Sequence, residues 1–234
     1  FELEPVDTTP GSSYHISDIE LASRLSYFLW STVPDDNLAA LAEEGKLQDP
    51  VNLEKQVRRM LADPRAESLS TRFASQWLRL QDLEGRVPDP LLFPQFDTTL
   101  GESMRRETEL LFDTIVREDL SVLELLMADY TFVDERLANH YEIPNITGNR
   151  FRRVGVFQDE RKGLLGHASI LTLTSIANRT SPVARGKYIM EVVLGSPPPA
   201  PPPDVPELEK TEATDGDKLL TLRERMEAHR KNPL

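Results

Sequence analysis

The strongest constraint on the fold is a helical period that recurs along the chain without a matching strand period. In the longest such stretch, residues 97–118, the apolar side chains of Leu100, Met104, Leu111 and Ile115 recur four or seven positions apart. An α-helix brings these positions onto one face, whereas a half-buried strand requires strict alternation. No alternating stretch is long enough for a sheet. The sequence therefore predicts a mainly α fold built around a central helix at residues 97–118.

Start and stop signals divide the rest of the chain into further helices. Ser17 and Glu20 match the capping box, in which each side chain satisfies a free backbone N–H at a helix start, and a helix is predicted from there to Trp30. Asp63–Pro64 ends one predicted helix and begins the next. Residues 151–157 favour β structure and predict a small hairpin. We expect a bundle-like array of helices with one small β-hairpin.

Residues 178–203 combine a helix start, a basic cluster, a helix stop and a proline-rich arm. Thr180 or Ser181 can cap a helix that begins at Pro182, and Gly195 suits the left-handed residue that follows a helix. Seven prolines between positions 197 and 206 predict a polyproline II strut. Positive side chains at a helix start are unfavourable unless an anion or a carboxylate compensates them. The candidate junction or anion-binding residues are Asn178, Arg179, Ser181, Arg185 and Lys187.

The predicted elements and the shifts in composition divide the chain into five segments. These are a lead-in at 1–16, an N-terminal helical subdomain at 17–96, a second helical subdomain at 97–196, a Pro-rich and acidic linker at 197–217, and a C-terminal helix at 218–234. The start at Phe1, without a charged and then apolar leader, indicates a fragment of a longer protein.

Charge and residue usage exclude several functions. The 234 residues carry 27 basic and 39 acidic side chains, a net charge of −12, whereas nucleic-acid binding requires clustered positive charge. No apolar run approaches the roughly 18 residues that cross a bilayer. The chain has no cysteine, which excludes disulfides, thiolate metal sites and covalent haem attachment within these residues. The common nucleotide-binding, hydrolase and zinc-protease motifs are missing, and no metal site is predicted.

Two histidines and two glutamates fall inside predicted core elements. Imidazole can bind haem iron or transfer protons, which makes His140 and His167 candidates for a haem-related or proton-related role. The alternative, which we favour, is a capping or hydrogen-bonded surface histidine without such a role. Glu107 and Glu109 could act as paired carboxylates. Their spacing places them on different faces of the helix, so surface ion pairs are the favoured interpretation.

Several separated runs occur in a characteristic order. The most distinctive combines RTSP-x-x-RG with LG-S-PPP-A-PPP over residues 179–203. The others are Glu20–Trp30, Pro34–Leu38, Gln56–Pro64, Phe73–Leu78, Arg105–Phe112 and Asp129–Tyr141. Together these runs, which span nearly the whole chain, resemble the paired domains of unknown function found in planctomycete-type cytochrome-associated proteins.

The resemblance implies a place in a larger protein. In that family the paired domains lie between upstream modules, one of them c-type cytochrome-like, and a downstream segment with a C-x-x-C-H haem-attachment motif. This chain stops at Leu234, short of that segment. The resemblance therefore implies a periplasmic or cell-envelope protein, with c-type haem in flanking segments and no cofactor within this chain. His140 matches the family's pattern, whereas His167 stands where a different polar residue is expected.

Three functions remain compatible with these residues. The first is an accessory scaffold that positions a neighbouring haem module for electron transfer, with domains of the same polypeptide and a redox protein as partners. The second is an envelope oxidoreductase or polymer-acting enzyme, which requires Arg179, Arg185 and His140 to share one cleft. The third is a protein-interaction module in which Pro197–Pro203 binds an aromatic groove.

Overall fold

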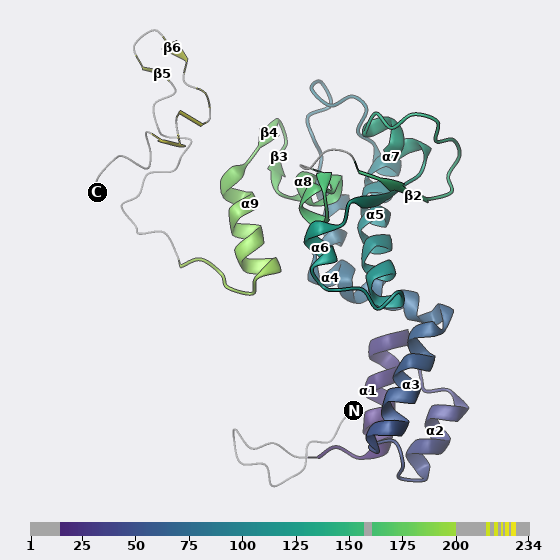
Figure 1. The fold of residues 1–234 in the computed structure, drawn as a ribbon. Helices are drawn as coiled ribbons and strands as arrows, with labels where there is room; N and C mark the ends of the chain where they lie inside the picture. The colour runs from purple at the N-terminus through teal and green to yellow at the C-terminus, as the bar shows by residue number, and fades with distance from the viewer. Residues whose placement is uncertain are drawn as a thin grey trace.

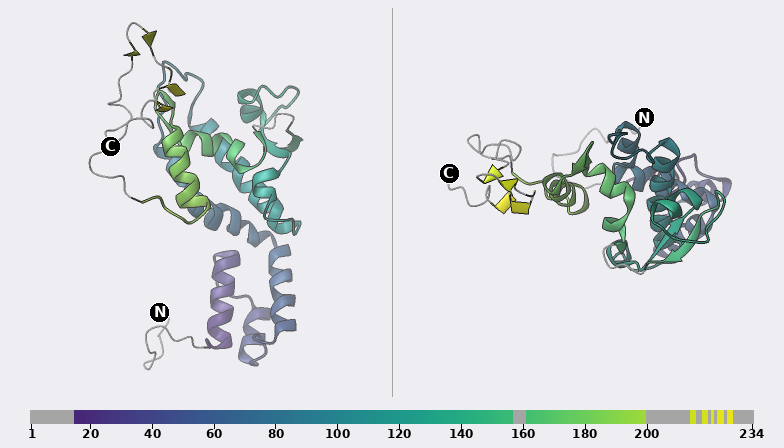
Figure 2. Two further views of the ribbon diagram at one scale, coloured as in Figure 1. Left: turned by 60° about the vertical axis from the view of Figure 1, so that its left-hand side comes forward. Right: turned by 90° about the horizontal axis from the view of Figure 1, so that it is seen from above.

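The protein is described by a computed structural model that covers residues 15–156 and 161–199, with residues 214, 215, 218, 219, 221, 223, 224, 226 and 227. Across these residues the fold is mainly α, which confirms the prediction from the helical period. Three N-terminal helices lie together at one end of the molecule, and the other helices form a larger body (Figures 1 and 2).

The three N-terminal helices enclose a small core of their own. Ser17 begins the first of them, where its hydroxyl accepts a hydrogen bond from Glu20 N and its N–H donates to Glu20 Oε2 at 2.7 Å, which confirms the predicted capping box. Trp30 Nε1 donates to the Met60 carbonyl at 2.9 Å and ties the first helix to the third. The elements are α1 (Asp18–Trp30), α2 (Asp36–Glu43) and α3 (Pro50–Ala62).

Four short helical segments connect α3 to the larger body. Asp63 ends α3 in an extended conformation and caps the next turn at Arg65, as the Asp63–Pro64 signal predicts. The helix predicted to begin at Asp63–Pro64 is divided into several short pieces, and Arg79, between the last two, takes a left-handed backbone conformation with φ 54°. The pieces are η1 (Pro64–Glu67), the π-helix η2 (Leu69–Ala74), α4 (Ser75–Trp77) and η3 (Leu80–Gly85).

Helix α5 (Thr98–Arg117) is the centre of the body and contacts elements from both halves of the chain. Asp97 begins it by accepting a hydrogen bond from Leu100 N at 2.8 Å. The predicted apolar face is buried: Leu100, Met104, Leu111 and Ile115 are all within the core. The sequence thus predicts both the bounds and the inward face of this helix.

A two-stranded antiparallel sheet lies beside α5. The strands are β1 (Tyr130–Val133) and β2 (Arg152–Gly155), with Thr131 opposite Val154. The predicted β structure near residues 151–157 is present, but its partner is β1 and not a neighbouring strand of a local hairpin. Helix α6 (Glu124–Met127) precedes β1, and α7 (Glu135–His140) separates the two strands.

The C-terminal half supplies elements that close over the other side of α5. They are η5 (Leu164–Gly166), α8 (Ala168–Leu173), the hairpin strands β3 (Ser175–Ile176) and β4 (Arg179–Thr180), α9 (Pro182–Tyr188) and the π-helix η6 (Ile189–Val193). The predicted cap is confirmed, since Ser181 Oγ accepts from Ala184 N at 3.3 Å. Gly195 has φ 60° and ends the helical run as predicted.

The predicted polyproline strut and acidic linker lie mostly outside the described residues. Beyond them, β5 (Thr214–Asp215) pairs with β6 (Lys218–Leu219). In the predicted C-terminal helix, residues 218 and 219 therefore form a strand, residues 223, 224, 226 and 227 are helical, and the remainder except residue 221 falls outside the described part.

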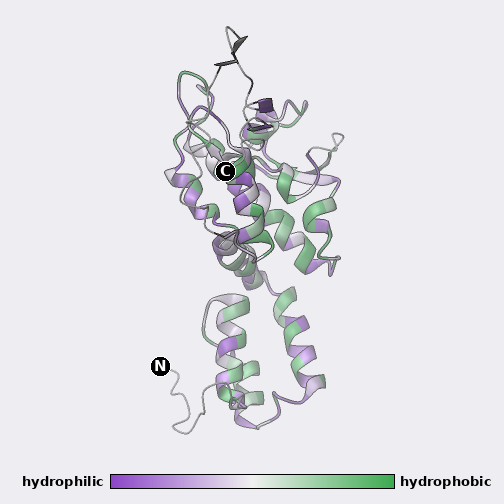
Figure 3. Cartoon of the chain, turned by 90° about the vertical axis from the view of Figure 1, so that its left-hand side faces the viewer, coloured by the Kyte–Doolittle hydropathy of each residue, from purple (hydrophilic) through white to green (hydrophobic). Residues whose placement is uncertain are grey.

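Core side chains from distant parts of the sequence pack together. One cluster joins Leu78, Leu80 and Leu83 with Leu164 and Tyr188, across the boundary predicted at residue 96. The five predicted segments themselves stay a prediction. Figure 3 shows hydrophobic and hydrophilic residues interspersed along the helices, as expected of amphipathic elements. Among the described residues, no helix combines the length and the apolar character needed to cross a membrane.

Candidate functional site

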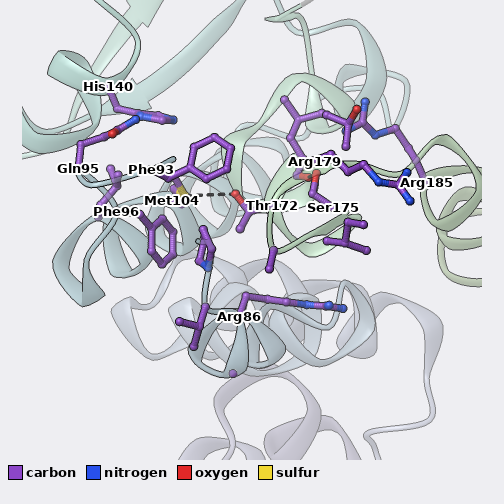
Figure 4. Close-up of a pocket in the computed structure, with 18 residues that line it drawn as sticks. Arg86, Phe93, Gln95, Phe96, Met104, His140, Thr172, Ser175, Arg179 and Arg185 are labelled. Carbon is purple, nitrogen blue, oxygen red and sulfur yellow. Dashed lines mark hydrogen bonds between the residues drawn. The ribbon is translucent and has the colours of Figure 1, made fainter. Parts of the chain in front are cut away.

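A cavity of about 580 Å³, which we call the arginine cavity, opens into the body (Figure 4). Helix α5 supplies part of its apolar wall through Leu100 and Met104, and Phe93 and Phe96 extend that wall from the preceding loop. The end of α8, the β3–β4 hairpin and the start of α9 form the opposite side. The polar and charged lining residues are Arg86, Gln95, His140, Thr172, Ser175, Thr180, Arg179 and Arg185.

Hydrogen bonds fix the loop at residues 85–96 over this cavity. Asp89 N donates to the Ala177 carbonyl of the hairpin at 2.8 Å, and the Asp89 carboxylate accepts from Leu91 N at 2.9 Å. At the other end of the loop, Arg136 donates to the Gln95 carbonyl at 2.6 Å. The wall carrying the two phenylalanines is therefore anchored at both ends.

The enzymatic function requires His140, Arg179 and Arg185 to share one cleft, and all three do line this cavity. Figure 4 places His140 toward one side and Arg179 and Arg185 toward the other, and all three line the same space. Burial lowers the pKa of His140, and the nearby Arg161 and Arg136 act in the same direction. At neutral pH the positive charge of this cavity therefore comes from its arginines.

The other candidate junction residues lie nearby but do not line the cavity. Asn178 is exposed in the turn between β3 and β4, and Lys187 is exposed on α9. Ser181 is engaged as the cap of α9. Arg185 donates from Nε to Thr174 Oγ1 at 3.2 Å, a side-chain hydroxyl at the end of α8. Sequence reasoning missed Arg86, because no local pattern shows that the loop would bring it to the cavity that the other two arginines line.

Glu107 on α5 is buried and not a surface ion-pair residue, which corrects the sequence-based interpretation. It is 1% exposed; its Oε1 accepts from Thr131 Oγ1 at 2.5 Å and its Oε2 from Tyr141 Oη at 2.7 Å. Burial raises the pKa of Glu107 to about 7, although both hydroxyl donors oppose the shift. The carboxyl lines a second cavity of about 210 Å³, together with Arg161, and can change its charge near neutral pH.

Glu109 forms the predicted ion pairs, but it is buried and not at the surface, which corrects that part of the interpretation. It is 4% exposed and accepts from Arg105 Nε at 2.8 Å and from Arg106 at 3.2 Å. Ser75 Oγ on α4 donates to it at 3.2 Å. Arg106 also pairs with Glu67 of η1. This ion-pair network connects α5 to the segment that leads in from the N-terminal helices, so its role is structural.

His167 is 1% exposed, which corrects the expectation of a surface histidine, and it lines neither the arginine cavity nor the second cavity beside Glu107. Its Nδ1 shares a hydrogen bond of 2.9 Å with Thr108 Oγ1, which also contacts Ser169 Oγ at 2.7 Å. Burial lowers the pKa of His167 to about 3, so the ring is neutral at physiological pH. Its Nε2 has no hydrogen-bond partner among the described residues. His140 and His167 are not brought together.

Two glycines make the close approach of η5 possible. A Cβ added to Gly163, whose φ is 60°, would overlap the Leu126 carbonyl, and one added to Gly166 would overlap the Arg161 backbone. Gly163 N donates to the Ala128 carbonyl at 3.0 Å in the same contact. This approach brings His167 and α8 against α5.

Three side-chain contacts, which we call the α9 clamp, fasten α9 and η6 to the body. Trp77 Nε1 donates to the Val192 carbonyl at 2.9 Å, and Tyr188 Oη donates to the Leu78 carbonyl at 2.9 Å. Arg79 and Glu191 form an ion pair at 3.2 Å. The residues on the two sides of each contact lie more than 100 positions apart in the sequence, so no local signal predicts them.

The described residues show no fitting site for a haem or a metal ion. No group of three His, Asp or Glu side chains among them could hold a metal. Covalent haem attachment requires cysteine, and the sequence has none. His167 is enclosed in the core, away from both cavities. A haem in flanking segments stays an expectation from the family resemblance.

Comparison with protein families gives two matches. The model described as PSD4, protein of unknown function (DUF1592), matches residues 16–143, more than half of the chain. The model described as PSCyt3, protein of unknown function (DUF1588), matches residues 161–234. Comparisons with curated proteins and with solved structures found no match. The α9 clamp joins the two matched segments, since Trp77 and Leu78 belong to the first and Tyr188 and Val192 to the second.

Proposed function

Because the chain belongs to the family described as PSD4, protein of unknown function (DUF1592), we propose that it acts as an accessory scaffold within a larger cytochrome-like protein. In this proposal the described residues position a neighbouring haem module for electron transfer in the periplasm or cell envelope. The partners are domains of the same polypeptide and a redox protein. The description PSCyt3 of the second matched segment supports a cytochrome-associated context.

The α9 clamp is the observation that carries this proposal. A scaffold must fix the direction in which the chain leaves it, and the helical run at 182–193 directly precedes the proline-rich arm. Two of the clamp contacts are bonds from partly or fully buried side chains to backbone carbonyls, each contributing about 1 kcal/mol. Ser196 N then donates to the Met190 carbonyl at 2.8 Å and closes the helix end. The exit of the chain toward its next segment is thus tied to the body.

A matched pair of substitutions tests the clamp. Trp77→Phe removes the indole N–H that reaches Val192, whereas Trp30→Phe removes the same kind of bond, to Met60, within the N-terminal core. We expect hydrogen exchange of amides 186–194 to accelerate in Trp77→Phe and to stay unchanged in Trp30→Phe. Equal exchange in both variants would contradict a role for Trp77 in holding the arm.

A second candidate function is favoured by one specific observation. His140, Arg179 and Arg185 line a single cavity, which is the condition that an envelope oxidoreductase or polymer-acting enzyme with this cleft must meet. The test is turnover of a bound substrate by the natural protein, with loss of turnover in Arg185→Gln. Binding without turnover would reject the enzymatic function and would not affect the scaffold proposal. The interaction module at Pro197–Pro203 stays a prediction, because most of that run lies outside the described residues.

A further inference from the structure

We propose that the arginine cavity binds an elongated organic anion, a carboxylate with an apolar aliphatic or aromatic body. The charged end lies at Arg86 and Arg185, and the body lies along Phe93, Phe96 and Met104. This inference shares its cavity with the enzymatic candidate but requires only binding. It is independent of the α9 clamp.

The charge of the lining selects for an anion. The chain as a whole has a net charge of −12, yet the lining of this cavity contains three arginines and no aspartate or glutamate. Arg86 forms no ion pair among the described residues, and Arg185 uses only Nε, toward Thr174. The terminal nitrogens of Arg185 therefore remain able to donate to a carboxylate in the two-bond geometry that guanidinium favours.

The remainder of the lining selects for an apolar body. Phe93, Phe96, Leu100 and Met104 form a continuous wall, to which Ile176 adds from the hairpin. The volume of about 580 Å³ lies within the range of roughly 300–1,000 Å³ that is typical of small-molecule sites. An inorganic anion would leave this wall in contact with water, so an ion alone does not explain the site.

Hydrogen bonds hold the loop wall of the cavity in place. The bond from Asp89 N to the Ala177 carbonyl joins the loop to the hairpin, and the bond from Arg136 to the Gln95 carbonyl fixes the loop's far end. A site that does not have to be ordered on binding loses less affinity to conformational entropy. The apolar wall therefore does not have to be ordered by the ligand.

The test measures binding of decanoate to the natural protein by calorimetry, with decan-1-ol and decyltrimethylammonium as matched probes. We expect saturable one-site binding of decanoate, weaker binding of the alcohol and none of the cation. The double variant Arg86→Gln/Arg185→Gln should bind decanoate at least about tenfold more weakly, because two charged hydrogen-bond donors are removed. Arg58→Gln, an exposed position on α3, should bind as the natural protein does.

A second variant keeps the test decisive if the double variant fails to fold. Ile176 is 42% exposed at the wall, so Ile176→Trp should narrow the cavity without disturbing the core and should weaken binding of decanoate and of the alcohol alike. No saturable binding of decanoate by the natural protein, equal binding of the cationic probe, or unchanged affinity in a folded double variant would each overturn the proposal. Binding without any turnover would support it while rejecting the enzymatic candidate.

Discussion

The hydroxyl of Tyr141 donates to Glu107 Oε2 at 2.7 Å, and the same hydroxyl accepts from the backbone N–H of Ala168 at 2.8 Å. This pair links three elements that are distant in sequence: α5, the end of α7 and the start of α8. Tyr141 and Glu107 fall in the first family segment and Ala168 in the second. The two segments of unknown function are therefore joined through a buried carboxyl, as well as through the α9 clamp.

Glu107→Gln should make the protein more stable at high pH than the natural protein. Burial raises the pKa of Glu107 from 4.5 to about 7, so the folded state holds a proton that the unfolded state releases. The stabilisation from this proton is fully present below pH 4.5 and is lost as pH rises to about 7. Urea unfolding should show that the free energy of unfolding of the variant, relative to that of the natural protein, rises by on the order of 2 kcal/mol between pH 5 and pH 8.

Thr131→Val is the control for this prediction. It removes one hydrogen bond to the same carboxyl but keeps the titrating group. We expect a loss of about 1 kcal/mol, with the pH dependence retained. If Glu107→Gln and the natural protein show parallel pH profiles, the carboxyl does not titrate in this range.

His167→Asn should reduce the loss of stability in acid. Burial lowers the pKa of His167 from 6.5 to about 3, so between these values the unfolded state binds a proton that the folded state cannot. The natural protein therefore loses stability as pH falls below 6.5, by on the order of 3 kcal/mol at pH 4. Thr108→Val, which keeps the imidazole, should retain this slope. If the stability of His167→Asn depends on pH as that of the natural protein does, another group causes the loss of stability in acid.

Gly163→Ala should be far more destabilising than Gly148→Ala. Both glycines have positive φ, 60° and 80°, which costs an alanine about 1–2 kcal/mol. Only at Gly163 would the added methyl group also overlap the backbone of Leu126, whereas nothing lies within 4 Å at Gly148. The overlap adds about 1–3 kcal/mol, as overpacking does elsewhere. If the two variants lose equal stability in thermal unfolding, the positive φ alone accounts for the need for glycine at position 163.

Arg185→Ala should weaken the start of α9 without changing the helical content. The substitution removes the single bond to Thr174 and should cost about 1 kcal/mol, seen as a lower midpoint in thermal unfolding. Lys187→Ala on the same helix is exposed and should stay within about 0.5 kcal/mol of the natural protein. Faster proteolysis of the linker after Pro206 in Arg185→Ala alone would support a junction role for this arginine, and identical cleavage in both variants would refute it.

The sequence was sufficient to predict the structural features that depend on residues close together in the chain. The capping residues Ser17 and Ser181 and the inward face of α5 are local signals, and the structure confirms them. The β structure near residue 152 was also visible, but its partner β1 was not. Strand pairing depends on a contact across about 20 residues, and nothing in either strand specifies which segment it will meet.

The buried carboxyls could not be predicted from sequence for a related reason. Arg105 and Arg106 precede Glu109 at helical spacing, which is typical of an exposed ion-paired face, and Glu107 directly follows the same two arginines. Their burial depends on hydroxyls contributed from elsewhere, by Thr131 and Tyr141 for the first and by Ser75 for the second. For the arginine cavity, the sequence provided only the requirement that Arg179, Arg185 and His140 share one cleft if the protein is an enzyme. The loop that forms one wall of the cavity is held by long-range contacts, which the sequence does not reveal.

The most direct test of the scaffold proposal is a distance measured in the polypeptide that the proposal requires, one that carries a haem module beside these residues. The 234 residues contain no cysteine, so a spin label at Glu102→Cys, exposed on α5, is selective within this region. Pulsed electron paramagnetic resonance between this label and the haem iron should give a narrow distance distribution in the natural protein and a broad one in Trp77→Phe. A missing haem signal, or equally broad distributions in both proteins, would contradict the proposal that these residues position a haem module.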